Sequence, residues 1–326
     1  MIKAITLVGV ILLAMLFSAI AGHEWVSPGQ LLRAISGEPS LDSQLLLAWR
    51  IPRVLAAALV GALLGLGGAI FQGVFRNPLA EPYLLGSSGG AAIGATVALL
   101  VPLGLPGGPL LAVLSFLGAW AATWIVLAVA GLHGRPDAAG LLLAGVAIAA
   151  MLGALRSFLM LALSDDAINL QVVLSWTLGG IQTPSWYGLA LLFVLTVLAL
   201  IFTARLASGL DLLGLGDEQA HAFGLDPAQF VRRAVLVGAA IVAAAVAWGG
   251  LVAFVGLIAP HIARWWAGPR HGWLLPLSAG IGAVIVTICD GIARAVLPPA
   301  EIPLGLITAL AGGPFFLFLL ARRLRS

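Results

Sequence analysis

Few side chains in this sequence of 326 residues could carry out catalysis, and their spacing fits no catalytic motif. Lys3 is the only lysine, so the chain lacks the lysine that follows the glycines of a phosphate-binding P-loop. His23 and Glu24 are adjacent, but no second histidine completes the pattern of a zinc protease. Cys289 is the only cysteine, which excludes an intrachain disulfide and a cysteine-cluster metal site. We therefore expect no catalytic residues, no cofactor and no metal centre.

Two further patterns resemble functional motifs of membrane proteins, and both are incomplete. Asp290 is a single carboxylate within an apolar run, whereas an intramembrane protease needs a serine with a base, or paired aspartates. The NPLA at 77–80 resembles the Asn-Pro box of water channels. That fold needs two such boxes, and this chain has no second Asn-Pro. Neither an intramembrane protease nor a water channel is therefore favoured.

The composition predicts that these residues lie in a membrane. The chain is 61% hydrophobic and only 9% charged, with a mean hydropathy of +1.12, against about 25% charged residues in soluble proteins. Because roughly twenty apolar residues cross a bilayer, we expect an all-α polytopic membrane protein with about ten transmembrane helices. The apolar runs cover residues 4–22, 54–74, 85–103, 109–130, 139–163, 186–204, 233–249, 251–266, 273–295 and 304–321.

The basic residues predict how these spans are oriented, because lysine and arginine are enriched in cytoplasmic loops. If the N-terminus is cytoplasmic, the inside segments hold Lys3, Arg76, Arg135, Arg205, Arg232, Arg233, Arg264, Arg270, Arg322, Arg323 and Arg325. The outside segments then hold only Arg33, Arg50, Arg53 and Arg294. We therefore expect both termini in the cytoplasm. A cleaved signal peptide at the first run is a weaker alternative, because that run is long and further spans follow it.

One polar stretch, FRNPLAEPYLLGSSGG at 75–90, interrupts the apolar pattern on the expected cytoplasmic side. Unsatisfied backbone amides are costly in lipid, so this stretch must lie in water, in protein or against a water-filled cavity. Asn77-Pro78 and Glu81-Pro82 disfavour helix at the residue before each proline. The next helix then begins with Ser87 and Ser88, small hydroxylated residues that suit a helix lining a passage.

Small residues recur at helical spacing within two of the runs and predict close helix packing in lipid. Gly61, Gly65 and Gly68 mark one such face, and Gly145, Ala149 and Gly153 mark another. Arg156 shares the second face by the spacing of four, four and three residues. An arginine near the bilayer centre costs roughly 2.5–3.5 kcal/mol on insertion scales. Two readings stay open for Arg156, a contact to an anionic substrate in the path and snorkelling to the outer surface.

The stretch LLGLGDEQAHAFGLD at 212–226 lies in a long segment between two expected spans, on the cytoplasmic side. Asp217 is placed to cap a helix N-terminus, and Gly224 suits the left-handed residue that ends one. The helix between them, over 218–223, is too short to be stable alone, so it must be held by packing.

Four blocks together resemble the FecCD family of ABC importer permeases. The first two are RIPRVLAAALVGALLGLGGAIFQ (50–72) and the polar stretch that follows it. The others are GGLVAFVGLIAPHIARWWAGPRHGWLLPLSAG (249–280) and CDGIARAVLPPAEIPLGLITALAGGPFFLFLLARR (289–323). They occur in the family's order and extend from Arg50 to Arg323, whereas the first fifty residues match only through WVSPGQLL (25–32). The family supplies permease subunits for iron-siderophore, haem and cobalamin import.

The resemblance implies a type II ABC importer permease: a ten-helix subunit that dimerises around a translocation path. Its expected partners are a second copy, two cytoplasmic ABC ATPases and one extracytoplasmic substrate-binding protein. ATP hydrolysis would then reside on a separate chain, which agrees with the missing P-loop lysine. We expect a single permease domain over 1–326, in the inner (cytoplasmic) membrane, with no nucleic acid as partner.

The resemblance also implies roles for particular residues. Arg50, Arg53 and Arg294 match the family's docking points for glutamates of the binding protein, although anchoring of helix ends is an alternative. Ser87, Ser88 and Arg156 are candidates for the translocation path. The segment at 217–224 matches the helix that enters a cleft on each ATPase. Its candidate residues are Asp217, Glu218, Ala220, Ala222, Phe223 and Gly224, with a small outward face at the two alanines.

The sequence therefore favours a membrane permease that translocates a bulky metal chelate, a ferric siderophore, haem or cobalamin, with ATP hydrolysed by partner subunits. The alternative is a stand-alone secondary transporter coupled to protons through Asp290 or Glu301. An importer permease needs a partner ATPase for uptake, whereas a secondary transporter does not.

Overall fold

The computed structural model describes residues 2–37, 40–102, 107–131, 138–163 and 167–323, and every regular element within them is helical. Among these residues, eight helices are long and apolar enough to cross a membrane. Their helical segments are α1 (Ile2–Ile20), α4 (Ile51–Val74), α6 (Gly107–Ala130), α7 (Ala138–Leu163), α9 (Trp186–Leu213), α11 (Pro227–Gly249), α13 (His271–Ala295) and α14 (Leu304–Arg323). The expected multi-pass, all-helical architecture is confirmed.

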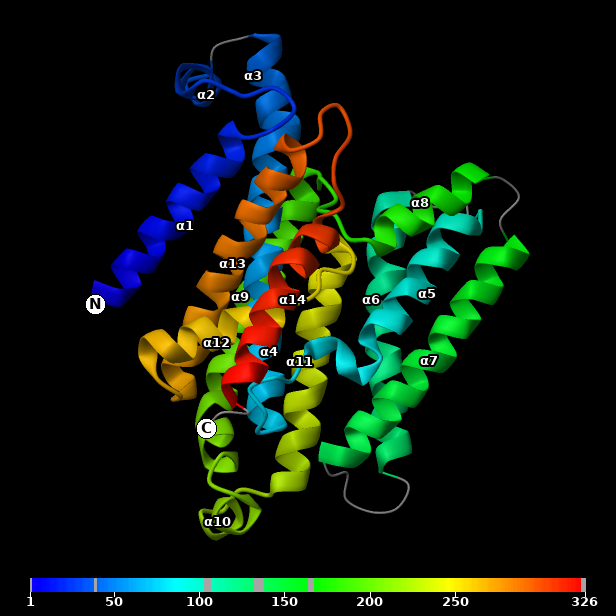
Figure 1. Cartoon of the computed structure of the whole chain (residues 1–326), viewed down its shortest axis with the longest axis vertical. Coiled ribbons are helices and arrows are strands. Elements are labelled where there is room, and N and C mark those ends of the chain that lie inside the picture. The colour runs from blue at the N-terminus through cyan, green and yellow to red at the C-terminus, as the bar shows by residue number, and fades with distance from the viewer. Residues whose placement is uncertain (1, 38–39, 103–106, 132–137, 164–166, 324–326) are drawn as a thin grey trace.

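Two of the ten expected spans are shorter than a bilayer crossing. These are α5 (Ser87–Leu100), with 14 residues, and α12 (Val255–Ala267), with 13. Each begins after an irregular segment that ends on a left-handed residue, Gly86 with φ +74° and Phe254 with φ +66°. The chain between α4 and α5 turns back into the body of the molecule before α5 begins (Figure 1). Each helix therefore covers only part of the depth that the apolar run predicted.

Hydrogen bonds tie these two irregular segments together. A short 3-10 helix, η2 (Pro82–Leu85), precedes α5. The hydroxyl of Tyr83 in η2 donates to the carbonyl of Val252, 3.2 Å away, and accepts from the Val252 amide at 3.3 Å. The carboxyl of Glu81 accepts from the backbone amide of Phe254. Side chains of the 75–86 segment are thus bonded within the protein, one of the locations that its polar composition allows.

Helix α4 forms the core, and small residues allow its close packing. In its most apolar window 78% of the residues are buried, against 11% for α7. It packs against α9, α11, α12 and α13. A side chain at Gly61 would collide with the Gly282 backbone, and one at Gly65 would collide with the Ser278 carbonyl oxygen. The close packing predicted for this glycine face is confirmed.

The remaining short helices lie at the two ends of the molecule (Figure 1). One end, called here the α3 end, carries α2 (Pro28–Ile35), α3 (Leu41–Leu45), the π-helical turn η1 (Leu46–Arg50) and α8 (Ala167–Thr177). The opposite end, called the α10 end, carries α10 (Asp217–Ala222). The amino group of Lys3 donates to the carbonyl of Trp266 near the end of α12, at 2.8 Å.

Candidate functional site

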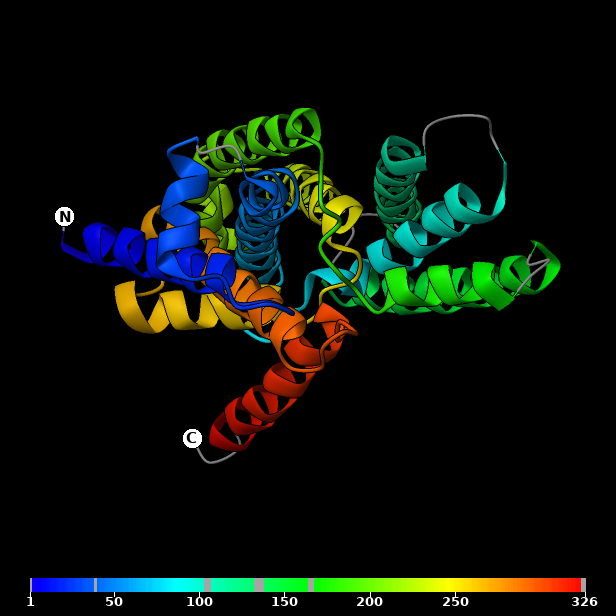
Figure 2. The ribbon, with the colours of Figure 1, turned by 90° about the horizontal axis from the view of Figure 1, so that it is seen from above.

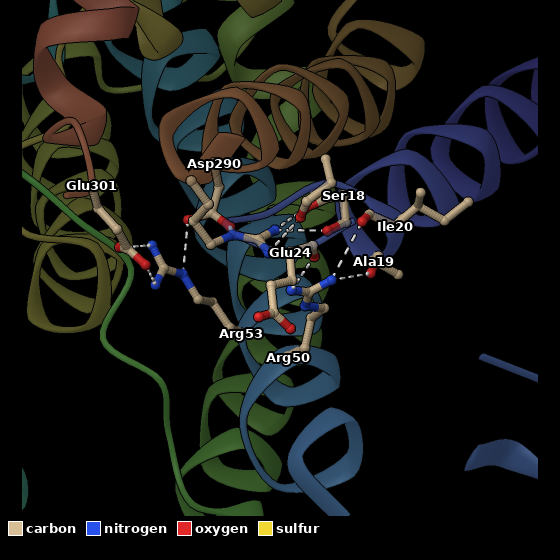
Figure 3. Close-up of polar contacts among 10 residues, drawn as sticks. Ser18, Ala19, Ile20, Glu24, Arg50, Arg53, Asp290 and Glu301 are labelled. Carbon is tan, nitrogen blue, oxygen red and sulfur yellow. Dashed lines mark hydrogen bonds and ion pairs between the residues drawn. The ribbon is translucent and has the colours of Figure 1, made fainter. Parts of the chain in front are cut away.

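Charged residues from four segments meet at the α3 end, and Figure 3 shows Arg50, Arg53, Asp290 and Glu301 among them. They include all three arginines assigned to docking. Arg50 ends η1, Arg53 lies in the first turn of α4, and Arg294 lies in the last turn of α13. Their partners include Asp290 and Glu301. The structure thus brings together residues almost 250 positions apart, and we call these five the arginine cluster.

Asp290 is the centre of the arginine cluster and is completely buried. Its Oδ1 accepts from Arg53 Nε and its Oδ2 accepts from Arg294 Nε, both at 3.0 Å. The spacing of Asp290 and Arg294, four residues apart on α13, puts them on one helix face. A buried carboxylate between two guanidinium groups is stable only while both partners remain, because an unpaired buried charge is costly.

Arg294 and Arg50 bind the C-terminal end of α1. Arg294 donates to the carbonyl oxygens of Ala21 at 2.8 Å and Ser18 at 2.7 Å, and its side chain is buried. Arg50 donates to the carbonyl oxygens of Ala19 at 3.2 Å and Ile20 at 3.3 Å. The last carbonyls of a helix have no partner within it and favour cations. Two of the three arginines therefore join α1 to α4 and α13.

Arg53 is held from outside the helices by Glu301, in the segment between α13 and α14. Its Nη1 and Nη2 donate to Glu301 Oε1 at 3.1 Å and Oε2 at 2.8 Å (Figure 3). This two-point arrangement is the strong form of an arginine–carboxylate pair. The Glu301 side chain is 51% exposed and that of Arg53 only 17%. Glu301 is thus the acidic group of the cluster that solvent or another protein reaches first.

A cavity of about 320 Å³ opens beside the arginine cluster. Arg50, Arg53, Arg294 and Glu301 are among the residues that line it. Two exposed tryptophans, Trp25 and Trp49, line it as well. The sequence showed these tryptophans, but nothing in their spacing indicated that the fold would place them together beside the arginines.

The turn after α4 contacts α10 through one ion pair. Arg76, with φ +49°, pairs with the carboxylate of Asp217 in the first turn of α10. In the same turn, the side chain of Asn77 accepts from the Leu79 amide at 3.1 Å. Both members of the ion pair are exposed. The polar stretch therefore connects α10 with the segment that leads into α5, a link that sequence reasoning did not predict.

Glu81 lies in this turn and was not assigned a role from the sequence. One of its carboxyl oxygens, Oε2, is buried without a hydrogen-bond partner among the described residues. Burial raises the pKa of Glu81 from 4.5 to about 7, and the hydrogen bond from the Phe254 amide opposes that rise. Desolvation disfavours the charged form of a carboxyl, which explains the direction. Glu81 is therefore poised to change protonation near neutral pH.

Helix α10 differs from its prediction in two respects. Its N-cap is Gly216, with φ +109°, and Asp217 is instead the first helical residue and pairs with Arg76. Ala220 was expected on an outward small face, but it is fully buried against the chain's own helices. Its other assigned residues, Asp217, Glu218, Ala222, Phe223 and Gly224, are exposed, Phe223 to 69%. Gly224 has φ +84°, the left-handed conformation predicted for it.

The residues assigned to the translocation path lie on α5 and α7. Ser87 is buried, and its hydroxyl has no partner among the described residues, whereas Ser88 is partly exposed. Arg156 on α7 is partly exposed, and its Nε is buried without a described partner. On the same helix, Gly145 and Ala149 approach the start of α5, while Gly153 has open space beside it. The small-residue face thus packs on the chain at one end and is open near Arg156.

Sequence comparison identifies the family of this fold. The FecCD transport family matches residues 10–322. The chain belongs to the FecCD transport family. It is 42% identical to the hemin transport system permease protein HmuU of Yersinia pestis, over 84% of this chain and 82% of that protein. It is 37% identical to the vitamin B12 import system permease protein BtuC of Salmonella paratyphi A, over 97% of this chain and 93% of that protein.

A solved structure agrees with the family assignment. This FecCD chain superposes on a metal-chelate type ABC transporter in an inward-facing conformation with a TM-score of 0.83. The two chains are 30% identical, and the match covers 97% of each. The chain is therefore a multi-pass ABC importer permease of the type II fold, a transport subunit and not itself an enzyme. These findings do not support the proton-coupled alternative, and Asp290 is already engaged by two arginines.

Proposed function

We propose that this permease imports a bulky metal chelate, haem, cobalamin or a ferric siderophore, using ATP hydrolysed by partner subunits. The observation that carries the proposal is the superposition along 97% of the chain on a transporter of the metal-chelate type. The similarity of this chain to the hemin and vitamin B12 permeases supports the same substrate class. We further propose that residues 1–326 form one permease domain in the inner membrane.

The test is an uptake assay with labelled haem, cobalamin and several ferric siderophores. The permease is expressed with its ATPase and binding protein in a strain that lacks its own importer. We expect uptake of at least one chelate, and no uptake when the ATPase carries a substitution of its P-loop lysine. Uptake that persists without ATP hydrolysis would instead favour the proton-coupled alternative.

The working assembly in this proposal contains a second copy of the permease, two ABC ATPases and one extracytoplasmic binding protein. The exposed apolar faces of α7 and α14 leave room for contact with a second copy. Leu143 and Leu161 of α7 and Leu310 of α14 are among their most exposed residues. The α10 end would face the cytoplasm and the ATPases, and the α3 end would face the binding protein.

Docking of the binding protein is proposed at the arginine cluster and the cavity beside it. Arg50 and Arg294 already satisfy the end of α1, which limits the charge that they can offer to a partner. Arg53 is nearer the surface, and Glu301 holds it. A glutamate of the binding protein would therefore exchange with Glu301 on Arg53. Trp25 and Trp49 would add apolar contact at the rim of the cavity.

The translocation path is proposed to include Ser87, Ser88 and Arg156. The partly exposed Ser88 and the open space at Gly153 next to Arg156 support this assignment. An arginine there would attract an anionic cargo, such as haem propionates or a ferric siderophore, more than cobalamin. The buried hydroxyl of Ser87 would act only after a movement of α5 exposes it.

Coupling to the ATPases is proposed at α10 through Asp217, Glu218, Ala220, Ala222, Phe223 and Gly224. Glu218, Ala222 and Phe223 are exposed residues that an ATPase cleft would contact. Ala220 would instead fix α10 to the permease, because its side chain is buried. The pair of Asp217 with Arg76 would carry a displacement of α10 to the turn that precedes α5.

A further inference from the structure

A deep apolar groove lies between α6 and α9, with the end of α11 as its floor. Its volume is about 750 Å³, within the range of roughly 300–1,000 Å³ that is typical of small-molecule pockets. Ala247 and Trp248 of α11 form the floor, and α11 packs against both walls. The two wall helices lie on the side of the molecule opposite α14 (Figure 2).

The walls carry two apolar stripes at helical spacing. On α6 the stripe contains Pro109, Val113 and Leu117, and on α9 it contains Tyr187, Leu191 and Leu195. In each stripe the residues are four apart, so they share one helix face. Val113, Leu117, Tyr187 and Leu191 are largely exposed. The stripes therefore face each other across the groove without covering each other.

The length of the apolar stripes along the wall helices matches the hydrocarbon thickness of one leaflet of a bilayer. Each stripe extends over eight residue steps, which is about 12 Å at 1.5 Å per residue. The hydrocarbon core is about 30 Å thick, so half of it is roughly 15 Å. The polar residues of the lining, Gln182, Thr183 and Ser185, all lie just before α9 begins, at one end of the groove. None of the described lining residues is charged.

We propose that this groove binds one acyl chain of a membrane phospholipid, with the polar headgroup beside Gln182, Thr183 and Ser185. Both walls are membrane-spanning helices, so lipid is the solvent that reaches the groove. An uncharged apolar trough with polar groups at only one end matches a lipid, which is apolar along its chain and polar at one end. A docked protein helix would leave the restriction of the polar lining residues to one end of the groove unexplained.

The groove lies beside a junction of several helices, so a bound lipid would affect how these helices are held together. The segment between α8 and α9 is bound to the floor, because the Gln182 amide donates to the Trp248 carbonyl at 2.9 Å. Nearby, the amide of Leu304 at the start of α14 donates to the Gly179 carbonyl, also at 2.9 Å. Thr183 lines both this groove and the cavity beside the arginine cluster. A bound acyl chain would therefore support the junction of α9, α11 and α14 next to the docking cavity.

Trp248 provides a direct probe of occupancy. The permease is placed in vesicles of phosphatidylethanolamine and phosphatidylglycerol whose acyl chains are brominated near the middle. Bromine quenches tryptophan fluorescence on contact, and comparison with Trp248→Phe isolates this residue among the ten tryptophans. We expect strong quenching of Trp248 in the wild type. We expect Ala112→Phe, which fills the groove from α6, to reduce that quenching at least twofold.

The matched control is Ala121→Phe, because Ala121 is an exposed alanine on the same helix but outside the groove lining. It should leave the quenching of Trp248 unchanged. Val113→Phe is a second groove variant at an exposed position, in case Ala112→Phe folds poorly. Native mass spectrometry should find one fewer retained phospholipid per chain in the groove variants than in the control. Equal quenching in all variants, absent quenching in the wild type, or crosslinking of Leu191 to another polypeptide would overturn the proposal.

Discussion

The charged groups at the two ends of the molecule are organised differently. At the α3 end, Asp290 is buried between Arg53 and Arg294, and the arginines also satisfy carbonyl oxygens of α1. At the α10 end, the pair of Arg76 and Asp217 is exposed, and in the neighbouring turn one oxygen of Glu81 has no described partner. The charged groups at the α3 end therefore mainly stabilise the fold. Those at the α10 end and in the neighbouring turn remain free to change partner or protonation state.

This difference shows that position in the sequence does not by itself tell whether an arginine binds a partner or stabilises the fold. All three arginines of the cluster lie at the expected outer ends of spans, yet two are engaged mainly with α1. A surface ion pair contributes little to stability, about 0–1 kcal/mol. Breaking a buried pair costs about 3–5 kcal/mol. The exposed fraction decides which of these two values applies.

The largest effect is expected from Asp290→Asn, which removes the buried charge between two guanidinium groups. It should lower the free energy of unfolding by about 3–5 kcal/mol. Thermal unfolding of the purified permease in detergent measures this loss. The control is Glu301→Gln, since its exposed carboxylate should contribute no more than about 1 kcal/mol. Equal stability of the two variants would show that the arginine cluster is not a buried ion network.

A second effect is expected at Glu81, whose protonated form the fold favours. Its pKa rises from 4.5 to about 7, so its contribution to stability is complete below about pH 4.5 and disappears as the pH rises through about 7. Glu81→Gln should therefore be more stable than the wild type at pH 8, by about 1–3 kcal/mol, with little difference at pH 5. Unfolding measured across this pH range provides the test. Parallel pH profiles for both proteins would contradict the assignment.

The exposed face of α10 should control coupling to the ATPase. Ala222→Trp places a large group on that face, so we expect at least a threefold loss of ATPase co-purification and of chelate uptake, with normal permease stability. Ala220→Trp is the matched comparison, because it inserts the same side chain at a buried position and should destabilise the permease itself. Full co-purification and full uptake for Ala222→Trp would remove α10 as the coupling element.

Arg156→Ala should lower transport of an anionic chelate severalfold while leaving assembly and basal ATP hydrolysis intact. The reason is its position beside the open part of the small-residue face on α7. Uptake in vesicles, compared between a ferric siderophore and cobalamin, separates a charge effect from general damage. Unchanged transport with greater stability in membranes would support snorkelling instead.

The smallest effect is expected from Glu301→Gln at the docking surface. Removing the carboxylate that holds Arg53 should raise the association rate of the binding protein about twofold to fivefold at low salt, because rim charges mainly affect the rate of association. The gain should shrink at high salt, where screening is stronger. Surface plasmon resonance with the permease in nanodiscs would measure it. A slower association would mean that Glu301 itself contacts the partner.

Local properties of the sequence determined the helices and their packing surfaces. Each of the ten apolar runs contains a helix, because hydropathy over some twenty residues is enough to identify one. The glycine face of α4 was equally visible, since small residues four apart lie on one side of a helix. The left-handed Gly224 was also predicted, because its neighbours alone indicate a helix end. Family resemblance then supplied the expected roles.

Only the tertiary structure decided which charges are paired and which faces are covered. Arg53 meets Asp290 across 237 residues, and no local pattern shows such a contact. The burial of Ala220 depends on how α10 lies against the chain's own helices, so its helical periodicity could not reveal it. The start of α5 at Ser87 likewise depends on the turn before it, which runs back into the body of the molecule. Ion pairing and burial depend on which residues lie close together in space. A local stretch of sequence does not specify those neighbours.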